Sequence, residues 1–214
     1  MGAPRLTLVC FAVKEEANPF RRAARGRPEI EVVLTGMGTR NAARALRDSL
    51  ACTRPDLVLS AGFAGGLRPD LSSGSVMFSM EGQPELERRL QAAGAQAVKF
   101  HCVGRVATTA AEKRALREQT GADAVEMESE VIHSICSERG IPSATVRVIL
   151  DTADEDLPLD FNELMTSDQT LDGRKLALAL MKTPQKVGAL LRLQKQSAAA
   201  AERLGEVLEQ VLGI

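Results

Sequence analysis

The sequence predicts an α/β protein built around a mainly parallel sheet. Apolar, β-branched runs alternate with amphipathic stretches almost from the start of the chain, which is typical of βαβ units. Two acidic groups, at 126–128 and 151–154, follow apolar runs. Reacting groups in α/β proteins lie at the carboxyl ends of parallel strands, so these acids are candidates for a site. Either group alone would favour the alternative, solvated acids in loops.

The first half of the chain predicts four strands and three helices. Short runs rich in Val, Ile and Leu predict the strands, and apolar residues three or four positions apart predict the helices. The expected strands are 6–13, 30–35, 57–60 and 75–80, and the expected helices are 14–25, 41–52 and 84–94. Gly36-Met37-Gly38 closes the second strand, and a cluster with Gly62, Gly65 and Gly66 follows the third.

The second half predicts strands at 97–106 and 144–150 and helices at 110–119 and 128–139. Gly140, with Pro142 beyond it, ends the last of these helices in an ordinary way. Helical sequence resumes at 174, is interrupted near Pro184, and ends in a long amphipathic helix. Its apolar stripe resembles a coiled-coil seam, but its short length favours packing against the protein's own sheet.

Length and composition indicate one domain, residues 1–214, with a C-terminal helical tail at about 174–214. The chain has 214 residues, of which 44% are hydrophobic, and this suffices for a sizeable core. The formal net charge is −1 and the arginines are scattered, so we expect no nucleic-acid partner. The four cysteines stand far apart and form no CxxC. We therefore expect a cytoplasmic, metal-free protein, and no apolar run is long enough for membrane insertion.

The glycine clusters allow more than one interpretation. Gly36-Met37-Gly38 before a helix suggests dinucleotide binding, but Asn41 stands where that fingerprint has its third glycine, and no acid closes a following strand at the required distance. The cluster at Gly62, Gly65 and Gly66 would let a ligand approach backbone N–H groups. A tight turn that serves only packing explains that cluster equally well.

Four stretches, in this order, resemble the nucleoside phosphorylase and nucleosidase superfamily: FAVKEEA, VVLTGMG, SAGFAGGLRPDLSSGSV, and AVEMES followed by VRVILDTAD. The resemblance covers most of residues 5–160. It implies a three-layer αβα sandwich with a mixed, mainly parallel sheet. It also implies a homodimer and cleavage of the bond between ribose and a purine without a cofactor. The tail beyond 160 is similar to the subgroup associated with hopanoid biosynthesis, which acts on adenosylhopane.

The resemblance implies a role for each acid. Asp151 would protonate the departing purine at N7, which requires a raised pKa, and an apolar strand end beside a carboxylate such as Asp154 would raise it. Glu128 would accept hydrogen bonds from the ribose hydroxyls while Met127 packs against the sugar, and Glu16 would position the attacking water. Glu126 would point away if its segment is extended.

Further residues complete the expected site. Arg147 either steadies the acid or forms a structural ion pair. The other expected substrate-binding residues are Phe63, Ala64, Gly65, Val106 and Thr108. In a phosphorylase, Gly38 and Arg40 would bind phosphate as co-substrate.

The chain also departs from the nucleosidase pattern. Phe63 replaces a serine, and the region of Ala107 lacks an aromatic residue that would face the purine, so Phe20 is a candidate to close the base pocket. Glu16 favours water over phosphate, because a carboxylate repels a dianion. The main hypothesis is therefore hydrolysis of a purine nucleoside or a 5′-modified adenosine derivative. Phosphorolysis and a catalytically weak nucleoside-binding protein are the alternatives.

Overall fold

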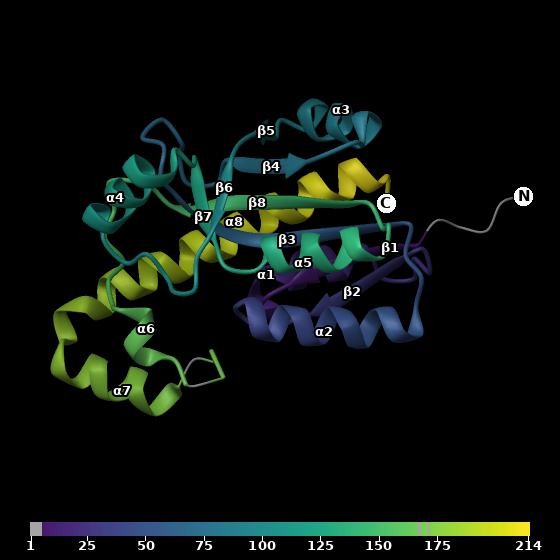
Figure 1. Cartoon of the computed structure of the whole chain (residues 1–214). Coiled ribbons are helices and arrows are strands. Elements are labelled where there is room, and N and C mark those ends of the chain that lie inside the picture. Colours follow the sequence, from purple (N-terminus) through teal and green to yellow (C-terminus); the bar gives the residue numbers. More distant parts are fainter. Residues whose placement is uncertain (1–5, 167, 171) are drawn as a thin grey trace, which may run out of the picture.

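The computed structural model describes residues 6–166, 168–170 and 172–214, and it has a central sheet with helices on both faces (Figure 1). The strands are β1 (Thr7–Phe11), β2 (Ile30–Leu34), β3 (Leu57–Gly66), β4 (Val76–Met80), β5 (Gln96–Ala97), β6 (Phe100–Cys102), β7 (Ala124–Glu126) and β8 (Ser143–Asp151). The helices are α1 (Lys14–Ala23), α2 (Thr39–Cys52), α3 (Pro84–Ala92), α4 (Ala110–Thr120), α5 (Ser129–Glu138), α6 (Phe161–Leu164), α7 (Gly173–Lys182), the 3-10 turn η1 (Pro184–Lys186) and α8 (Val187–Leu212).

The sheet is mixed and mainly parallel, as predicted. Its order is β2-β1-β3-β8-β4-β5. The four strands β2, β1, β3 and β8 run parallel, whereas β4 is antiparallel to β8. β7 pairs antiparallel with the end of β3, and β6 pairs with β7. The carboxyl ends of β1, β3 and β8 therefore meet at one edge, beside β7.

Alternation along the strands gives the sheet two buried faces. In β1, Leu8 and Cys10 belong to a cluster formed with α2 and α5, whereas Val9 and Phe11 pack with α1 and α8. Successive strand residues point to opposite faces, so one strand contributes to both layers. The second half of α8 packs into this core through a stripe of small and branched residues, namely Ala200, Leu204, Val207, Leu208 and Val211. Packing on the protein's own sheet, the interpretation favoured for this helix, is confirmed for this half.

Three elements differ from the prediction. The glycine cluster at Gly62, Gly65 and Gly66 is not a turn, because β3 continues through it with a register shift against β8. The single strand expected at 97–106 is two short strands, since the chain leaves β4 after residue 97 and pairs with β7 from residue 100. The short helix α6 was not predicted, because four residues give no visible period.

The C-terminal part departs from the layered arrangement before α8 reaches the core. α6, α7 and the first turns of α8 form a helical extension at one end of the molecule (Figure 1). Within the described part of the chain, no helix combines the length and the apolar character needed to cross a membrane.

Candidate active site

A cavity of about 300 Å³ lies at the edge where the carboxyl ends of the strands meet. Residues from the start of α1, the end of β3, β7 with its following loop, and β8 line it. The loop before α6 and the C-terminal extension close one side through Leu157, Phe161, Met165, Leu193 and Ser197. Most of this lining is apolar, so a few buried charged groups dominate the electrostatics of the cavity.

Arg147 is the centre of a buried ion cluster. Its Nη2 lies 2.6 Å from Glu126 Oε2, 3.1 Å from Glu128 Oε2 and 3.0 Å from Ser60 Oγ. Burial lowers the pKa of Arg147, but the carboxylates of Glu126, Glu128 and Glu16 outweigh it and raise the pKa overall. Arg147 therefore stays charged and holds two acids from the β7 segment against β8.

The two acids of this cluster differ in their surroundings. Burial raises the pKa of Glu126. Arg147 and hydrogen bonds from Glu128 N, Ser129 N and Ser129 Oγ lower it by more than burial raises it, so the pKa is below its ordinary value. Burial also raises the pKa of Glu128, and there Arg147 and the N–H of Gly38 only partly oppose the rise. The carboxylate of Glu126 therefore balances the charge of Arg147, and Glu128 is the acid of the pair that takes up a proton more readily.

Glu16 lies at the start of α1 and is 5% exposed. Its carboxylate accepts hydrogen bonds from the backbone N–H groups of Ala12 at 3.1 Å, Val13 at 3.2 Å and Phe63 at 2.9 Å. Burial raises the pKa of Glu16 to about 7, against the opposing effect of Arg147. A carboxyl group with this pKa takes up and releases a proton near neutral pH.

Asp151 ends β8 and forms an ion pair with Lys113 of α4. Lys113 is fully buried, and its Nζ lies 2.5 Å from Asp151 Oδ2. The same Nζ donates to the carbonyl oxygens of Thr152 and Glu155, each at 2.7 Å. Burial raises the pKa of Asp151 although Lys113 opposes the rise, and the carboxylate of Glu155 adds to it. The prediction of a raised pKa agrees with this direction, but the acidic neighbour is Glu155 and not the exposed Asp154.

The structure brings most of the predicted site residues together. Those that line the cavity are Glu16, Phe63, Ala64, Gly65, Val106, Met127, Glu128, Arg147 and Asp151. Thr108, Gly38 and Arg40 are not among the lining residues. Thr108 N donates to Glu112 and its carbonyl accepts from Leu157, Gly38 N donates to Glu128, and Arg40 is exposed.

Two expectations about side chains are wrong. Glu126 does not point away, because its carboxylate contacts Arg147 within the same cluster as Glu128. The chain leaves β7 directly after Glu126, which lets both acids reach one arginine. Phe20 does not close the base pocket: it is fully buried against Phe11 in the sheet core, and Phe161 lines the cavity instead.

Lys113 is the residue that the sequence interpretation missed. It lies 38 positions before Asp151, so no local motif joins the two. One signal was present: Lys113 shares a helical stripe with Leu116 and Thr120, at spacings of three and seven residues. A lysine on the inward stripe of an amphipathic helix needs a buried partner, and carboxylates are the usual ones.

Gly62 is the point where backbone, Glu16 and Arg147 approach most closely. Its φ is +152°, and a Cβ there would lie 2.6 Å from Arg147 Nη1 and 2.9 Å from Glu16 Oε1. We expect Gly62→Ala to displace both groups and to lower catalytic turnover about a hundredfold, as misplacement by about 1 Å does elsewhere. Steady-state kinetics on the folded variant measure this loss.

Gly74→Ala is the matched control, because Gly74 has a φ of +84° but no atom within 4 Å of the added Cβ. It carries backbone strain without contact with the cavity. Equal activity losses in the two variants would mean that strain, and not displacement of Glu16 and Arg147, explains the effect.

Comparisons with known proteins agree with this architecture. The family model of the phosphorylase superfamily matches residues 10–81 and 77–182. The fold is similar to a futalosine hydrolase from Helicobacter pylori, with a TM-score of 0.69, 16% identity and coverage of 96% of this chain and 98% of that chain. It is also similar to two 5′-methylthioadenosine/S-adenosylhomocysteine nucleosidases. The Helicobacter pylori structure has a TM-score of 0.68 at 15% identity, covering 97% and 99% of the two chains. The Neisseria meningitidis structure has a TM-score of 0.66 at 18% identity, covering 96% and 99%.

The family match extends over the strands and loops that carry Glu16, Glu128 and Asp151. The fold, the matched segments and the order of the motifs therefore lead to one conclusion. The chain belongs to the phosphorylase superfamily, the group of nucleoside phosphorylases and nucleosidases that its sequence motifs resemble.

Proposed function

We propose that this protein hydrolyses the N-glycosidic bond of a purine nucleoside or of a 5′-modified adenosine derivative. The observation that carries the proposal is that three buried acids, Glu16, Glu128 and Asp151, line one mostly apolar cavity and all have raised pKa values. Cleavage of this bond passes through a sugar with positive charge and needs a proton for the leaving base. A protonated carboxyl group supplies the proton, and an ionised one stabilises the positive charge on the sugar.

Asp151 is the proposed general acid. Lys113 binds Oδ2, so Oδ1 is the oxygen that carries the proton to the purine. The three contacts of Lys113 Nζ, to Asp151 and to two carbonyl oxygens, fix the carboxyl group at the end of β8. Burial favours the protonated form of Asp151, and the loss of a neutral base then leaves a carboxylate that Lys113 stabilises.

Glu128 and Met127 are the proposed ribose contacts. Glu128 is held by Gly38 N at Oε1 and by Arg147 at Oε2, so its carboxylate has one orientation before substrate binds. Acceptor positions that remain on its oxygens suit the sugar hydroxyls. A negative charge fixed here also stabilises the positive charge that develops on the ribose.

Glu16 is the proposed partner of the attacking water, which it orients and deprotonates. Because its pKa is about 7, the active carboxylate form is lost as the pH falls below that value. We expect kcat/KM to fall about tenfold per pH unit below about pH 7. Glu16→Gln is expected to have a low kcat/KM and to lack this decline on the acidic side of the pH profile. A pH–rate profile of both proteins measures it, and an unchanged decline in Glu16→Gln would assign the ionisation to another group.

Water is favoured over phosphate because the backbone donor of the expected phosphate cradle is already engaged and Arg40 does not line the cavity. The N–H of Gly38 donates to Glu128, and Gln169 lies so close that a Cβ on Gly38 would be 1.7 Å from its Oε1. The two arginines that line the cavity are both paired with acids, Arg147 with Glu126 and Glu128, and Arg105 with Glu112. A phosphate dianion needs free cations and N–H groups. The names of the similar structures, a hydrolase and nucleosidases, also support hydrolysis.

The test is to incubate the protein with adenosine, methylthioadenosine and a 5′-alkyl adenosine, with and without phosphate. Mass spectrometry then follows free base and sugar product. Free base with ribose, independent of phosphate, is the expected result. Ribose 1-phosphate would instead assign phosphorolysis, and binding without turnover would assign a nucleoside-binding protein.

A further inference from the structure

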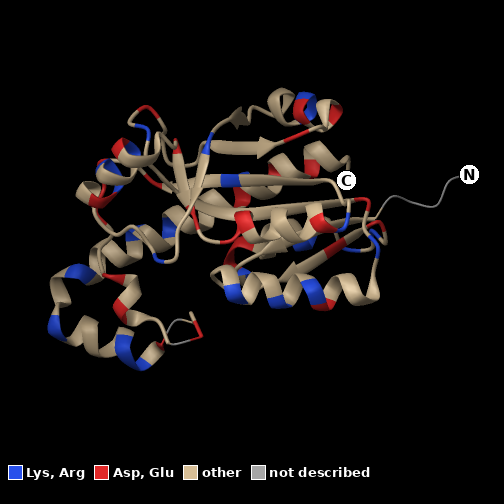
Figure 2. Cartoon of the chain, in the orientation of Figure 1, with Lys and Arg blue, Asp and Glu red and all other residues tan. Residues whose placement is uncertain are grey.

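The segment from α7 through the first half of α8, residues 173–201, has a charge distribution unlike that of the rest of the chain. Residues 173–201 contain six basic residues and no acidic one, namely Arg174, Lys175, Lys182, Lys186, Arg192 and Lys195. The whole chain has 27 basic and 28 acidic residues, so the remainder has 21 basic and 28 acidic residues, a formal net charge of −7. All six basic side chains are exposed. Figure 2 shows basic residues along α7 and the start of α8, whereas the nearby acidic residues lie on α6 and its flanking loops.

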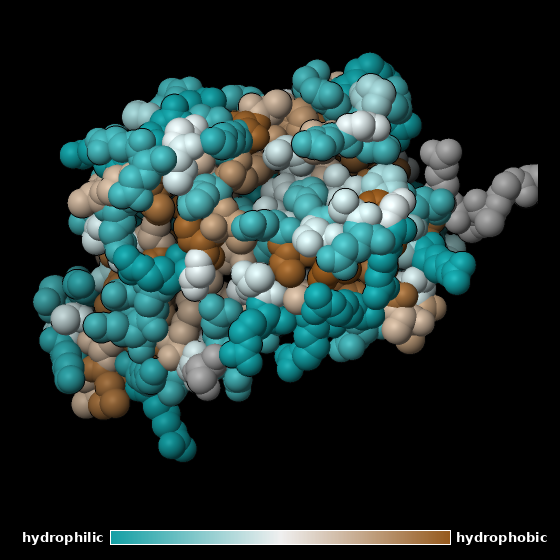
Figure 3. All heavy atoms as spheres, in the orientation of Figure 1, coloured by the Kyte–Doolittle hydropathy of each residue, from teal (hydrophilic) through white to brown (hydrophobic). Residues whose placement is uncertain are grey.

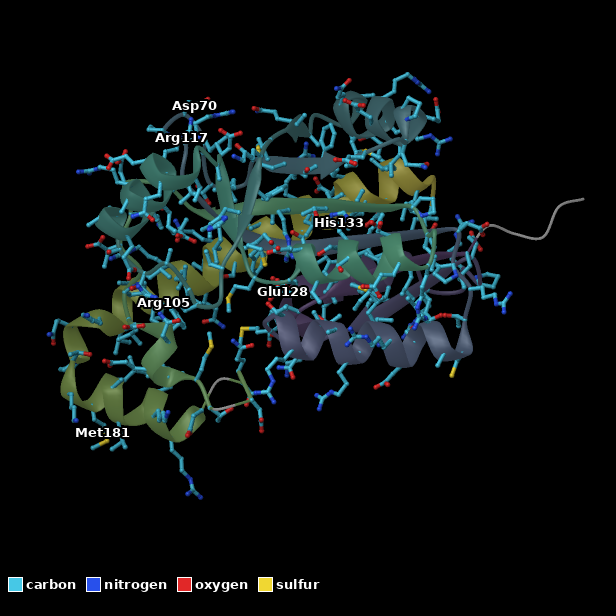
Figure 4. The ribbon with its side chains drawn as sticks, in the orientation of Figure 1. Asp70, Arg105, Arg117, Glu128, His133 and Met181 are labelled. Atoms are coloured by element: carbon cyan, nitrogen blue, oxygen red, sulfur yellow. The ribbon has the colours of Figure 1, made fainter. Side chains whose placement is uncertain are left out.

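The same segment carries exposed apolar side chains. Among the described residues, five large hydrophobic residues are exposed, and four of them lie here: Leu178 at 57%, Met181 at 79%, Val187 at 40% and Leu191 at 54%. Figure 3 shows hydrophobic surface over α7 at the lower left, and Figure 4 shows Met181 pointing away from the body of the molecule. Clustered exposed apolar side chains mark interaction surfaces, whereas single ones are ordinary.

The spacing places charge and apolar groups together on each helix. In α7, Arg174, Leu178 and Met181 lie at spacings of four and three residues, and so share one face. In α8, Val187, Leu191 and Lys195 lie at spacings of four. None of the ion pairs within the described ranges involves any of the six basic residues of this segment. A helix with apolar residues bordered by lysine and arginine is typical of one that lies in a membrane interface.

We propose that α7 and the first turns of α8 dock on the surface of an anionic lipid bilayer. The lysines and arginines meet the anionic headgroups, while Leu178, Met181, Val187 and Leu191 enter the boundary between headgroups and acyl chains. The attachment is peripheral and needs no spanning helix.

Charge complementarity selects this partner over a second copy of the chain. In a symmetric dimer through this face, the same patch would meet itself, and six positive charges would face six others. A nucleic acid would satisfy the charges but not the exposed leucine and methionine side chains, and the segment contains no aromatic residue for stacking on bases.

The docked segment is also part of the cavity wall. Leu193 and Ser197 of α8 line the cavity, and so does Met165, directly after α6. Docking therefore places the bilayer beside one wall of the proposed active site. The proposal does not depend on the proposed function, because binding to lipid is measured without substrate.

The experiment is co-sedimentation of the full chain with phosphatidylcholine vesicles, with and without phosphatidylglycerol, at low and high NaCl. We expect binding only to vesicles that contain phosphatidylglycerol, and weaker binding at high NaCl. Lys182→Gln/Lys186→Gln should bind about 25-fold more weakly, since each basic residue near such a surface contributes about fivefold. Leu178→Ser/Met181→Ser should also bind about tenfold more weakly, because less apolar area enters the interface.

Two variants are matched controls. Leu34→Ser removes the fifth exposed hydrophobic residue, on β2, and Arg44→Gln/Arg47→Gln removes two exposed charges from α2. Both should bind vesicles as the parent does. Equal binding to neutral and anionic vesicles, no binding at low NaCl, or equal loss in the controls would overturn the proposal. So would a dimer in sedimentation velocity that Leu178→Ser/Met181→Ser dissociates, because the face would then join two copies.

Discussion

Asp151→Asn is expected to release base about a hundred- to ten-thousandfold more slowly than the parent protein while keeping the fold. The amide fills the same volume at the end of β8 and still accepts a hydrogen bond from Lys113, but it has no acidic proton for the purine. Single-turnover release of adenine, measured at saturating nucleoside, isolates this step from substrate binding. Circular dichroism and thermal unfolding establish that the variant is folded.

Asp154→Asn is the matched control for this variant. It makes the same chemical change three residues later, at an exposed position in the loop that follows β8. Its rate of base release should be close to that of the parent. If Asp151→Asn retained full activity, or if Asp154→Asn were equally slow, the role of Asp151 as the general acid would be wrong.

Lys113→Met is expected to lower the free energy of unfolding by about 3–5 kcal/mol near neutral pH. The substitution keeps much of the apolar stem but removes the ammonium group that pairs with Asp151 and bonds to the carbonyl oxygens of Thr152 and Glu155. These three acceptors are then left without their buried donor. Urea unfolding followed by circular dichroism measures the loss.

The pH dependence of this loss tests its cause. Without Lys113, protonation of Asp151 removes the uncompensated buried charge, so the destabilisation should shrink as the pH falls and grow as it rises. In the Asp151→Asn background the same lysine substitution should lower the free energy of unfolding by less, because no buried carboxylate is left without its cationic partner. Equal losses in both backgrounds at all pH values would mean that Lys113 acts only through the carbonyl oxygens.

The local sequence was sufficient to predict the framework. The alternation of β-branched runs with amphipathic stretches depends on backbone geometry and solvent exposure, which act over a few residues. The strand that carries both Arg147 and Asp151, and the helix that contains Glu16, were therefore predicted within a few residues of their observed bounds. The glycine cluster was placed correctly but was given the wrong conformation, because a strand with a register shift and a turn both use glycine.

The sequence by itself determined the α/β class, the mainly parallel sheet and the acids that meet at its edge. Motif order and hydrophobic period specify these features, and neither depends on which distant side chains touch. Only the tertiary structure decided that Lys113 holds Asp151, that Glu126 and Glu128 share Arg147, and that Phe161 lines the cavity in place of Phe20. Pairings between buried charges far apart in the chain arise from the packing of helices on the sheet. That packing brings Lys113 of α4 to Asp151 at the end of β8, and no local pattern in the sequence predicts it.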